Sequence, residues 1–405
     1  MHILLIHQAF TTVDEAGGTR HYELARYLSD YGHRVTVIAS QVSYLSGQSL
    51  TDKKSTNSAV EPWITILRSY TYPLWHRSFV HRVLSFISFM VSSVVVGLQV
   101  KDVDLVWGTS PPLFQGGSAW LLAKLKRARF LFEVRDLWPA FAIQVGVLRH
   151  PLLILLSERF ERFLYRQADE VMINSPGFKE HVEQRGAKHV SVVPNGTDTQ
   201  LFDPNIDGNG FRSQVGLEGK YVVLYAGAHG LSNDLGVVLQ AAALLQAHPH
   251  ISIVFVGDGK EKTSLINQAN ALGLSNVLFL SPVSKREMPR VLAGADMCLA
   301  ILKPLPLYKT VYPNKVFDYL AAGKGVLLAI DGVIRQVLEN AQAGLFVTPG
   351  DAAALADAIL FMAEHIEQGK QMGINGRNYV KTHFERAKIA ASLNQVIETI
   401  VLTNP

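Results

Sequence analysis

The chain alternates short apolar runs with amphipathic stretches along most of its length, and this alternation limits its fold more than any other feature. The apolar runs have the length of buried strands, and the amphipathic stretches have the period of surface helices. Strands that alternate with helices form parallel sheets with helices on both faces, so the sequence predicts an α/β fold. In the first half the predicted strands are Ile3–Ile6, Val35–Ala39, Leu105–Trp107, Phe130–Glu133, Val171–Asn174 and Val190–Val193.

The alternation breaks once, near the middle of the chain. Pro204–Gly219 is polar and rich in glycine, without clear periodicity, which is typical of a junction between domains. A length of 405 residues also exceeds what one hydrophobic core usually serves. We therefore expect two doubly wound units, with a cleft where the carboxyl ends of their strands face each other. After the junction the predicted strands are Val222–Tyr225, Ile251–Val256, Val277–Leu280, Met297–Ile301, Val326–Ala329 and Leu345–Val347.

The composition excludes several classes of protein. The single cysteine, Cys298, rules out an intrachain disulfide and a metal site built from a cysteine cluster. The net charge of +4 is modest, and no basic stripe with interleaved aromatic residues calls for a nucleic-acid partner. The strand pattern starts directly at Met1 with no signal peptide before it, so we expect a cytoplasmic protein.

One segment indicates contact with a membrane. Arg77, His81 and Arg82 precede the uncharged run Val83–Val100, which is roughly long enough to cross a bilayer. Serines and a glutamine within the run weaken that interpretation, and strand-like residues follow it directly. We expect a buried or interfacial helix rather than a spanning one, attached peripherally to the inner face of the membrane.

The segment Tyr312–Gly325 carries the clearest chemical signal. Pro313 suits the start of a helix, and Gly323 suits its end. Lys315 and Asp318 are three residues apart, so they project from one side of this helix. A lysine beside free backbone N–H groups suits the phosphates of a nucleoside diphosphate, and a carboxylate suits the ribose hydroxyls. The alternative is that the two residues form an ordinary intrahelical ion pair.

Two glycine-rich turns follow predicted strands. Gly17 and Gly18, just before Arg20, let the backbone approach an anion near a helix N-terminus. The turn Gly257–Gly259 ends one strand and opens a helix, which is a common ligand position in such folds. Each pattern is weak alone, because a flexible loop or a plain connection uses the same residues.

Charged residues end one buried strand in an unusual way. Glu133, Arg135 and Asp136 fall within four positions, and charge at a buried edge is costly unless it is paired or functional. Arg135 can pair with either acid as a structural ion pair, or Asp136 can have a role in the cleft. His7 and His229 also follow strands and are candidates to line the cleft, although a lone histidine is more often a surface or core residue.

Taken in order, these motifs resemble a known family. The matching segments are Gly17–Gly18, Gly32–Val35, Glu133–Pro139, Val193–Gly196, Gly257–Gly259 and Pro313–Tyr319. Together they resemble the retaining glycosyltransferase family 4. Within it they look most like the WbuB-like branch, which is associated with O-antigen and capsule assembly and with amino-sugar transfer. The likeness runs over nearly the whole chain and depends on the order and spacing of the motifs.

The resemblance implies the GT-B fold, with two Rossmann-like domains and an interdomain cleft. Residues 1–198 would bind the acceptor, residues 199–385 would bind the nucleotide-sugar, and residues 386–405 would form a C-terminal helix that packs back on the first domain. The resemblance also implies a retaining transfer from a UDP-sugar to a lipid-linked glycan in bacterial surface polysaccharide synthesis. It implies that the reaction needs neither metal nor cofactor.

Residue roles carried over from the family fall on matching positions of this chain. Asp318 would hold the ribose, and Asp136 would face the reacting sugar; with Lys315 they form the predicted catalytic set. Because the chain lacks the family's usual clamp on the diphosphate, either Lys315 and Arg20 supply that positive charge or the transfer is weak. The other predicted donor contacts are Gly17, Gly18, Asn195, Gly227, His229, Gly257, Asp258, Gly259, Pro282, Val283 and Asn314.

The chain departs from the family pattern in two places. The first acidic residue of the family would lie eight positions before Asp318, where this chain has Thr310. The arginine and lysine that clamp the diphosphate would follow Gly227, and neither occurs in the stretch that ends at Asp234. Two alternatives therefore stay open: a UDP-sugar epimerase or hydrolase of the same fold, and a non-catalytic scaffold that binds a nucleotide-sugar.

Overall fold

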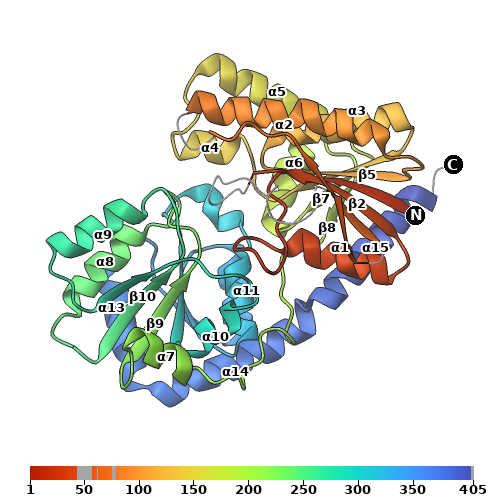
Figure 1. Ribbon diagram of the computed structural model, residues 1–405. Helices are drawn as coiled ribbons and strands as arrows, with labels where there is room; N and C mark the ends of the chain where they lie inside the picture. The colour runs from red at the N-terminus through yellow and green to blue at the C-terminus, as the bar shows by residue number, and fades with distance from the viewer. Residues whose placement is uncertain (43–56, 62, 75–78, 403–405) are drawn as a thin grey trace. The chain divides into compact units, whose positions relative to one another are not determined.

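The computed structural model describes residues 1–42, 57–61, 63–74 and 79–402, which form two units, each built on its own sheet (Figure 1). The first unit comprises Met1–Thr12, Gly18–Pro194 and the chain from Ala387 onward. The second comprises Val13–Gly17 and Asn195–Arg386. The last helix of the chain is therefore counted with the first unit.

Among the residues that the structure describes, eight strands form the sheet of the first unit. They are β1 (His2–Ile6), β2 (Arg34–Ser40), β3 (Asn57–Glu61), β4 (Ile64–Ser69), β5 (Leu105–Ser110), β6 (Arg129–Val134), β7 (Glu170–Ile173) and β8 (Val190–Val192). Their order is β3-β4-β2-β1-β5-β6-β7-β8, and neighbours are parallel except for the antiparallel pair β3–β4. The central strands β1 and β5 are buried throughout, as expected for strands covered on both faces.

Helices cover both faces of this first sheet. They are α1 (Arg20–Asp30), α2 (Phe79–Gln99), α3 (Leu113–Lys126), α4 (Ala140–Gln144), α5 (Pro151–Gln167), α6 (Lys179–Gln184), α15 (Arg386–Leu402) and the 3-10 turn η1 (Pro176–Phe178). In Figure 1, α2, α3 and α5 lie side by side on one face, and α1 and α15 lie on the other. His33, just after α1, has its Nε2 2.6 Å from Oδ1 of Asn394 on α15.

The second unit has a wholly parallel sheet of six strands. They are β9 (Tyr221–Ala226), β10 (Ile251–Val256), β11 (Val277–Leu280), β12 (Met297–Ile301), β13 (Gly325–Ala329) and β14 (Gly344–Phe346), in the order β11-β10-β9-β12-β13-β14. Its helices are α7 (Asn209–Val215), α8 (Leu235–Leu244), α9 (Lys262–Ala271), α10 (Met288–Ala293), α11 (Asn314–Ala321), α12 (Val333–Ala341), α13 (Ala352–Glu364), α14 (Ile366–His383) and the 3-10 turn η2 (Pro306–Thr310).

Alternate residues of β9 enter two different cores of the second unit. Val222 and Leu224 pack into a core that includes residues of α10, α11 and α12, whereas Val223 and Tyr225 pack into a core with α8, α9 and α13. This period of two explains why the strand reads as a continuous apolar run, since both of its faces are buried. The predicted fold class, two parallel-sheet Rossmann-like α/β domains, is confirmed.

Each sheet contains one place where the connecting helices diverge. In the second sheet it lies between β9, which continues through α8 to β10, and β12, which continues through α11 to β13 on the other side. In the first sheet it lies between β1 and β5. Doubly wound sheets bind ligands outside the carboxyl ends of the strands at such a switch point. The residues that follow these strands are therefore the first candidates for a site.

The uncharged run predicted as a buried or interfacial helix forms α2. This helix packs against β2, β4 and α3, so it belongs to the helical layer on one face of the first sheet. By length and composition it is, in the part of the chain that the structure describes, the one helix that could cross a membrane. Arg77, predicted to precede it as part of a basic cluster, lies outside the described residues.

Candidate functional site

Lys315 lies on the first turn of α11, at the switch point of the second sheet. Its Nζ is 3.8 Å from the centroid of the Tyr225 ring on β9 and 2.7 Å from where a Cβ on Gly227 would lie. Burial lowers the pKa of Lys315 to about 7. Among the described residues, no carboxylate forms an ion pair with it. An ammonium in such a place lacks a counter-ion, and it favours an anionic ligand such as a phosphate.

Asp318 stands on the same helix as Lys315 but has other partners. Its Oδ2 lies 2.6 Å from Nζ of Lys285, and its Oδ1 accepts a hydrogen bond from Oγ1 of Thr197 at 3.0 Å. Nδ2 of Asn314 also donates to Oδ2, at 3.2 Å. The alternative of an intrahelical ion pair between Lys315 and Asp318 is therefore wrong, because the carboxylate pairs with a lysine from another segment. A ribose that bound Asp318 would share it with Lys285.

The loops after β9 and β10 pack backbone against backbone. A Cβ on Gly257 would lie 1.9 Å from the carbonyl oxygen of Gly227, and one on Gly259 would lie 2.4 Å from the carbonyl oxygen of His229. Nζ of Lys262 donates to the Gly257 carbonyl at 2.7 Å and joins this loop to the next strand. The loop packing alone therefore requires both glycines, whether or not a ligand approaches them.

His229 is fully buried beside this loop. Its ring lies about 6 Å from the rings of Tyr225, Phe255 and Phe279, and neither ring nitrogen has a hydrogen-bond partner among the described residues. Burial lowers the pKa of His229 to about 4, so the imidazole is neutral at neutral pH. It therefore cannot replace the missing cation of the diphosphate clamp. Its backbone N–H donates to the carbonyl of Asp258, whose side chain is exposed.

The remaining predicted donor contacts surround α11 and β11. Nδ2 of Asn195 donates to the carbonyl of Tyr312 at 2.7 Å and so holds the segment ahead of α11. Pro282 is exposed and Val283 half-buried in the loop after β11. At the position of the family's first acid, Oγ1 of Thr310 donates to a carbonyl within η2. The second unit thus gathers most of the predicted donor residues at the carboxyl end of its sheet.

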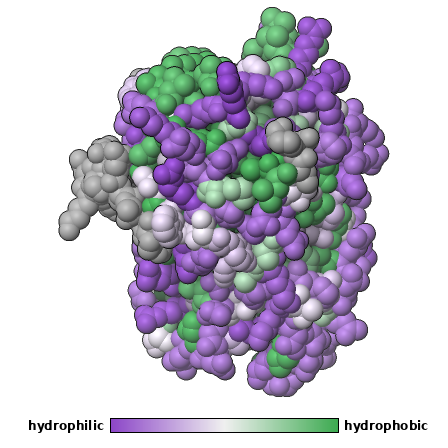
Figure 2. Space-filling view, turned by 90° about the vertical axis from the view of Figure 1, so that its right-hand side faces the viewer, coloured by the Kyte–Doolittle hydropathy of each residue, from purple (hydrophilic) through white to green (hydrophobic). Residues whose placement is uncertain are grey.

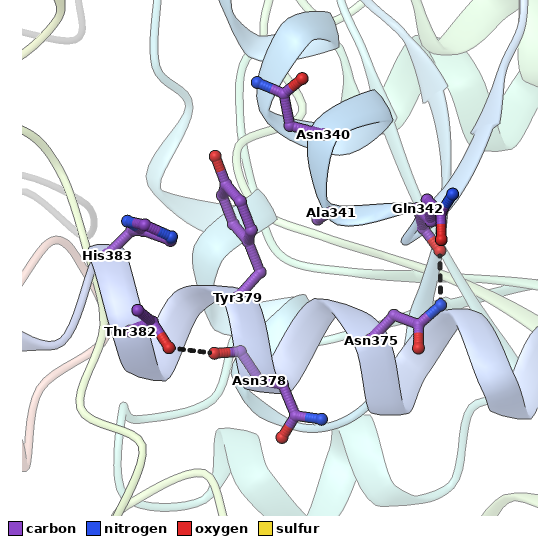
Figure 3. A pocket seen from close by; sticks show the side chains of 8 residues that line it. All are labelled: Asn340, Ala341, Gln342, Asn375, Asn378, Tyr379, Thr382 and His383. Carbon is purple, nitrogen blue, oxygen red and sulfur yellow. Dashed lines mark hydrogen bonds between the residues drawn. The ribbon is translucent and has the colours of Figure 1, made fainter.

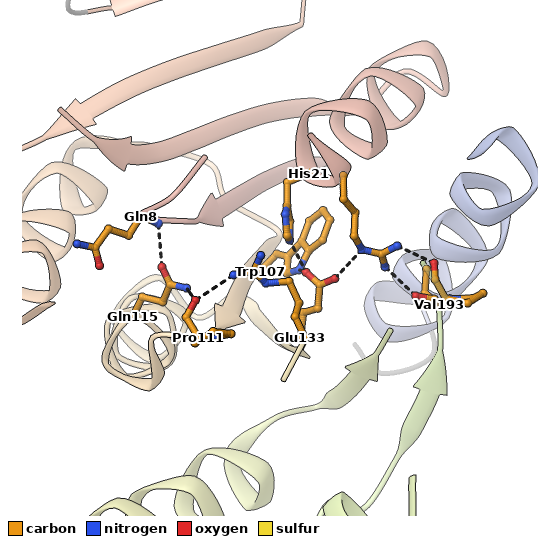
Figure 4. Close-up of polar contacts among 10 residues, drawn as sticks. Gln8, His21, Trp107, Pro111, Gln115, Glu133 and Val193 are labelled. Carbon is orange, nitrogen blue, oxygen red and sulfur yellow. Dashed lines mark hydrogen bonds and ion pairs between the residues drawn. The ribbon is translucent and has the colours of Figure 1, made fainter. Parts of the chain in front are cut away.

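A buried carboxylate organises the matching end of the first sheet (Figure 4). Glu133 is the second-to-last residue of β6 and has no solvent exposure. Its Oε2 accepts from Nε2 of His21 at 2.5 Å and from Nε1 of Trp107 at 3.1 Å, and its Oε1 accepts from Nε of Arg20 at 3.1 Å. Burial alone would raise the pKa of Glu133, but the charges of His21 and Arg20 hold it well below its usual range. Glu133 therefore stays ionised as the centre of a structural network.

Arg20 belongs to that network. Beyond its bond to Glu133, its guanidinium donates to the carbonyls of Pro194 and Val193 at 2.6 and 2.7 Å. The side chain is almost fully buried. The guanidinium thus ties α1 to the end of the first unit, and its contact with the diphosphate stays a prediction.

Arg135 and Asp136 follow Glu133 out of the sheet. Arg135 donates to the carbonyl of Pro111 at 2.9 Å, after β5, instead of forming the structural ion pair considered as an alternative. Asp136 is exposed. It stands beyond the carboxyl end of β6, so its role at the reacting sugar stays a prediction.

The glycines of the first glycine-rich turn differ from those after β10. Gly17 has a φ of +143°, a conformation that L side chains rarely adopt. Nothing lies within 4 Å of where a Cβ on Gly18 would be. Neighbouring atoms therefore do not require glycine at position 18, and the proposed close approach of a ligand remains a reason for it.

Two further features lie outside this arrangement. Among the described residues, no group of three or more His, Cys, Asp or Glu is placed to hold a metal ion. A shallow hollow of about 350 Å³ opens on the second unit (Figure 3). It is lined by Asn340, Ala341, Gln342, Asn375, Asn378, Tyr379, Thr382 and His383. It contains none of the predicted site residues.

Family models match the chain on both sides of its junction. Residues 16–196 match the glycosyl transferase 4-like domain, and residues 209–379 match the glycosyl transferases group 1. The chain belongs to the group 1 glycosyltransferases. Among curated relatives, this glycosyltransferase is 27% identical over 324 residues to the putative colanic acid biosynthesis glycosyl transferase WcaI of Escherichia coli, covering 76% of the chain and 78% of WcaI.

Solved structures support the GT-B fold of this glycosyltransferase. Sucrose-phosphate synthase from Thermosynechococcus elongatus aligns with a TM-score of 0.82 and 19% identity over 100% of both chains. Anabaena HepE in complex with UDP-glucose aligns with a TM-score of 0.73 and 18% identity, over 98% of this chain and 100% of HepE. At these identities the likeness establishes the fold and leaves the substrates open.

Sequence reasoning missed two parts of the site. Lys285, which pairs with Asp318, lies 33 residues earlier in a loop without a distinctive motif. The bond between Arg20 and Glu133 joins residues 113 apart. The one available signal was the charge of Glu133 at the end of a buried strand, which required a partner but did not say which one.

Proposed function

We propose that this glycosyltransferase takes its sugar from a UDP-sugar and adds it, with retention of the anomeric configuration, to a lipid-linked glycan. The product would be a bacterial surface polysaccharide, and the donor would carry an N-acetylated amino sugar, as in the WbuB-like branch. Two relatives support this proposal: WcaI is named for colanic acid biosynthesis, and the HepE structure holds UDP-glucose.

Lys315 is the observation that carries the proposal. Its ammonium has no carboxylate partner among the described residues, it lies against Gly227 at the switch point, and it stands on the first turn of α11. A nucleoside diphosphate carries the charge that such a place favours, and the free N–H groups at the start of α11 add further donors. The contacts of Lys315 therefore suit a donor whose leaving group is a diphosphate.

The proposed reaction needs few groups. The bond between the anomeric carbon and the diphosphate oxygen breaks, and a bond from the acceptor hydroxyl oxygen forms on the same face of the sugar. The acceptor proton passes to the departing phosphate. Lys315 meets the negative charge that develops on the leaving group, which is the kind of interaction that accelerates such a step. Asp318, with Lys285, would bind the ribose, and Asp136 would orient the sugar.

Calorimetric titration of the purified protein with UDP, GDP and dTDP tests the donor. We expect UDP to bind most tightly and Lys315→Ala to weaken its binding. NMR of the product formed from UDP-sugars and an acceptor extract would then identify the anomer. Release of UDP that never depends on an acceptor would favour the hydrolase alternative, and UDP binding without any turnover would favour the scaffold.

A further inference from the structure

One face of α2 is apolar and exposed along the entire helix. The exposed large side chains are Val80, Leu84, Ile87, Val91, Val95 and Leu98. Their spacing of three or four residues places them on a single stripe. Only 22% of the most apolar window of this helix is buried, although a core helix of the same composition would be mostly buried. The sheet and α3 thus cover one side of α2 and leave its outer side open.

The neighbouring helices of the same layer extend this surface. α3 exposes Leu121 and Leu125, and the first turns of α5 expose Leu152, Leu153, Leu155 and Leu156. α2 packs against α3, and α3 packs against α5, so the outer sides of the three helices form one continuous face. Figure 2 shows large hydrophobic areas at its upper edge, where Figure 1 places this layer. We call this surface the outer helical face.

The charge around the outer helical face has one sign. On α5, Arg159, Arg162 and Arg166 continue the exposed leucine stripe at helical spacing. α3 adds Lys124 near its end, and no described acid lies on α2 or α3. The two acids of α5, Glu158 and Glu161, are both paired with Arg185. The accessible charge on these helices is therefore basic.

We propose that the outer helical face binds an anionic lipid surface, with its leucines and valines in the interface and its arginines against the headgroups. This combination of an apolar stripe and basic side chains is typical of interfacial helices. α2 cannot span the bilayer while its other side packs on β2 and β4. A symmetric contact with a second copy would bring the basic residues of both copies together, which disfavours that occupant.

The proposal depends only on the first unit, and not on the proposed donor. It also enlarges the attachment site expected from the sequence, which was the segment from Arg77 to Val100 alone. The basic side chains of the outer helical face lie on α3 and α5, and its apolar side chains lie on α2, α3 and α5. Peripheral binding of this kind would hold the protein at the surface where a lipid-linked acceptor is embedded.

Sedimentation of the full chain with vesicles tests the proposal. We expect binding to phosphatidylcholine vesicles that contain phosphatidylglycerol, and weaker binding at high salt or without the anionic lipid. Each favourable charge removed should weaken binding about fivefold, so Arg162→Glu with Arg166→Glu should weaken it by at least about 25-fold. Leu84→Glu with Val91→Glu should also abolish it, because charge would then replace the buried stripe.

Matched changes on other surfaces serve as controls. Lys388→Glu with Lys381→Glu makes the same change of charge on α15 and α14, which are not part of the face, and Leu244→Glu alters an exposed apolar residue of α8. Leu244→Glu should bind vesicles within about twofold of the wild type. The double lysine variant should lose only the binding that follows from its lower net charge. UDP affinity and circular dichroism should be unchanged in all variants.

Three outcomes would overturn the proposal. The first is no sedimentation of the wild type with anionic vesicles at low salt. The second is equal loss of binding in the face variants and their controls. The third is a dimer in sedimentation equilibrium that Leu84→Glu with Val91→Glu dissociates, which would assign the face to a second copy of the chain.

Discussion

Lys315 and Asp318 stand three residues apart on one helix, yet each has a different chemical environment. Lys315 lies over an aromatic ring, and burial lowers its pKa. Asp318 forms an ion pair with Lys285. Lys315 is therefore a candidate to bind the negative charge of a ligand, whereas Asp318 must combine a structural role with any role in binding.

Replacing Lys315 with alanine should reduce transfer while the fold survives. Loss of one group that stabilises charge in the transition state costs on the order of 10²–10³ in rate. The lysine makes no ion pair within the described residues, so we expect little change in the melting temperature. Lys260→Ala, an exposed lysine in the same unit, should keep normal turnover in the same assay. Near-normal turnover of Lys315→Ala would exclude its assigned role.

A double-mutant cycle separates the two roles of Asp318. Lys285→Met leaves a largely buried carboxylate without its cation, and breaking such a pair typically costs about 3–5 kcal/mol. Adding Asp318→Leu should recover most of that stability in urea unfolding, since neither charge then remains. If the carboxylate binds ribose, the double variant should still bind UDP more weakly than the wild type, by roughly 1.5–3 kcal/mol of binding free energy. Recovery of both quantities would make Asp318 purely structural.

At the scale of elements, the network around Glu133 should make the first unit sensitive to acid. The folded pKa of Glu133 lies below its usual range, so the unfolded chain binds a proton that the folded chain does not. The pKa of His21 is also lowered, in its case by burial. Both contributions are present near neutral pH. The stability that depends on a neutral His21 is lost as pH falls below about 6.5, and the stability that depends on an ionised Glu133 is lost as pH falls below about 4.3.

The pH dependence of unfolding measures this effect. We expect the free energy of unfolding of the wild type to fall between about pH 6.5 and pH 3.5. Glu133→Gln should be less stable at pH 7, because Arg20 loses its buried partner, and should show a shallower decline with acid. A variant with the wild-type slope would show that other carboxylates dominate.

Elements differ in how far the sequence could predict them. β10 has its predicted bounds because its continuous apolar run is buried on both faces. β3 and β4 were not predicted, although Ile64 and Ile66 of β4 are buried at alternate positions. α12 was also missed, although Ile334, Val337, Leu338 and Ala341 have helical spacing. The pairs Arg20–Glu133 and Lys285–Asp318 depend on the fold and leave no local pattern.

At the scale of the whole molecule, each unit has its own sheet and its own stabilising contacts. Most donor contacts are assigned to residues of the second unit, and the Glu133 network belongs to the first. We therefore expect Glu133→Gln to keep the UDP affinity of the wild type at pH 7, measured by titration below the melting temperature. A large loss of UDP affinity would mean that the donor site depends on the first unit.

Proton exchange on UDP binding tests the central claim, that Lys315 meets the diphosphate, most directly. Without UDP, the pKa of Lys315 is about 7, and a bound diphosphate should raise this pKa. Calorimetry at about pH 8 in two buffers of different ionisation enthalpy should then show uptake of close to one proton per UDP. Lys315→Met should bind UDP more weakly and without proton uptake. UDP binding with no proton exchange, unchanged in Lys315→Met, would contradict the account.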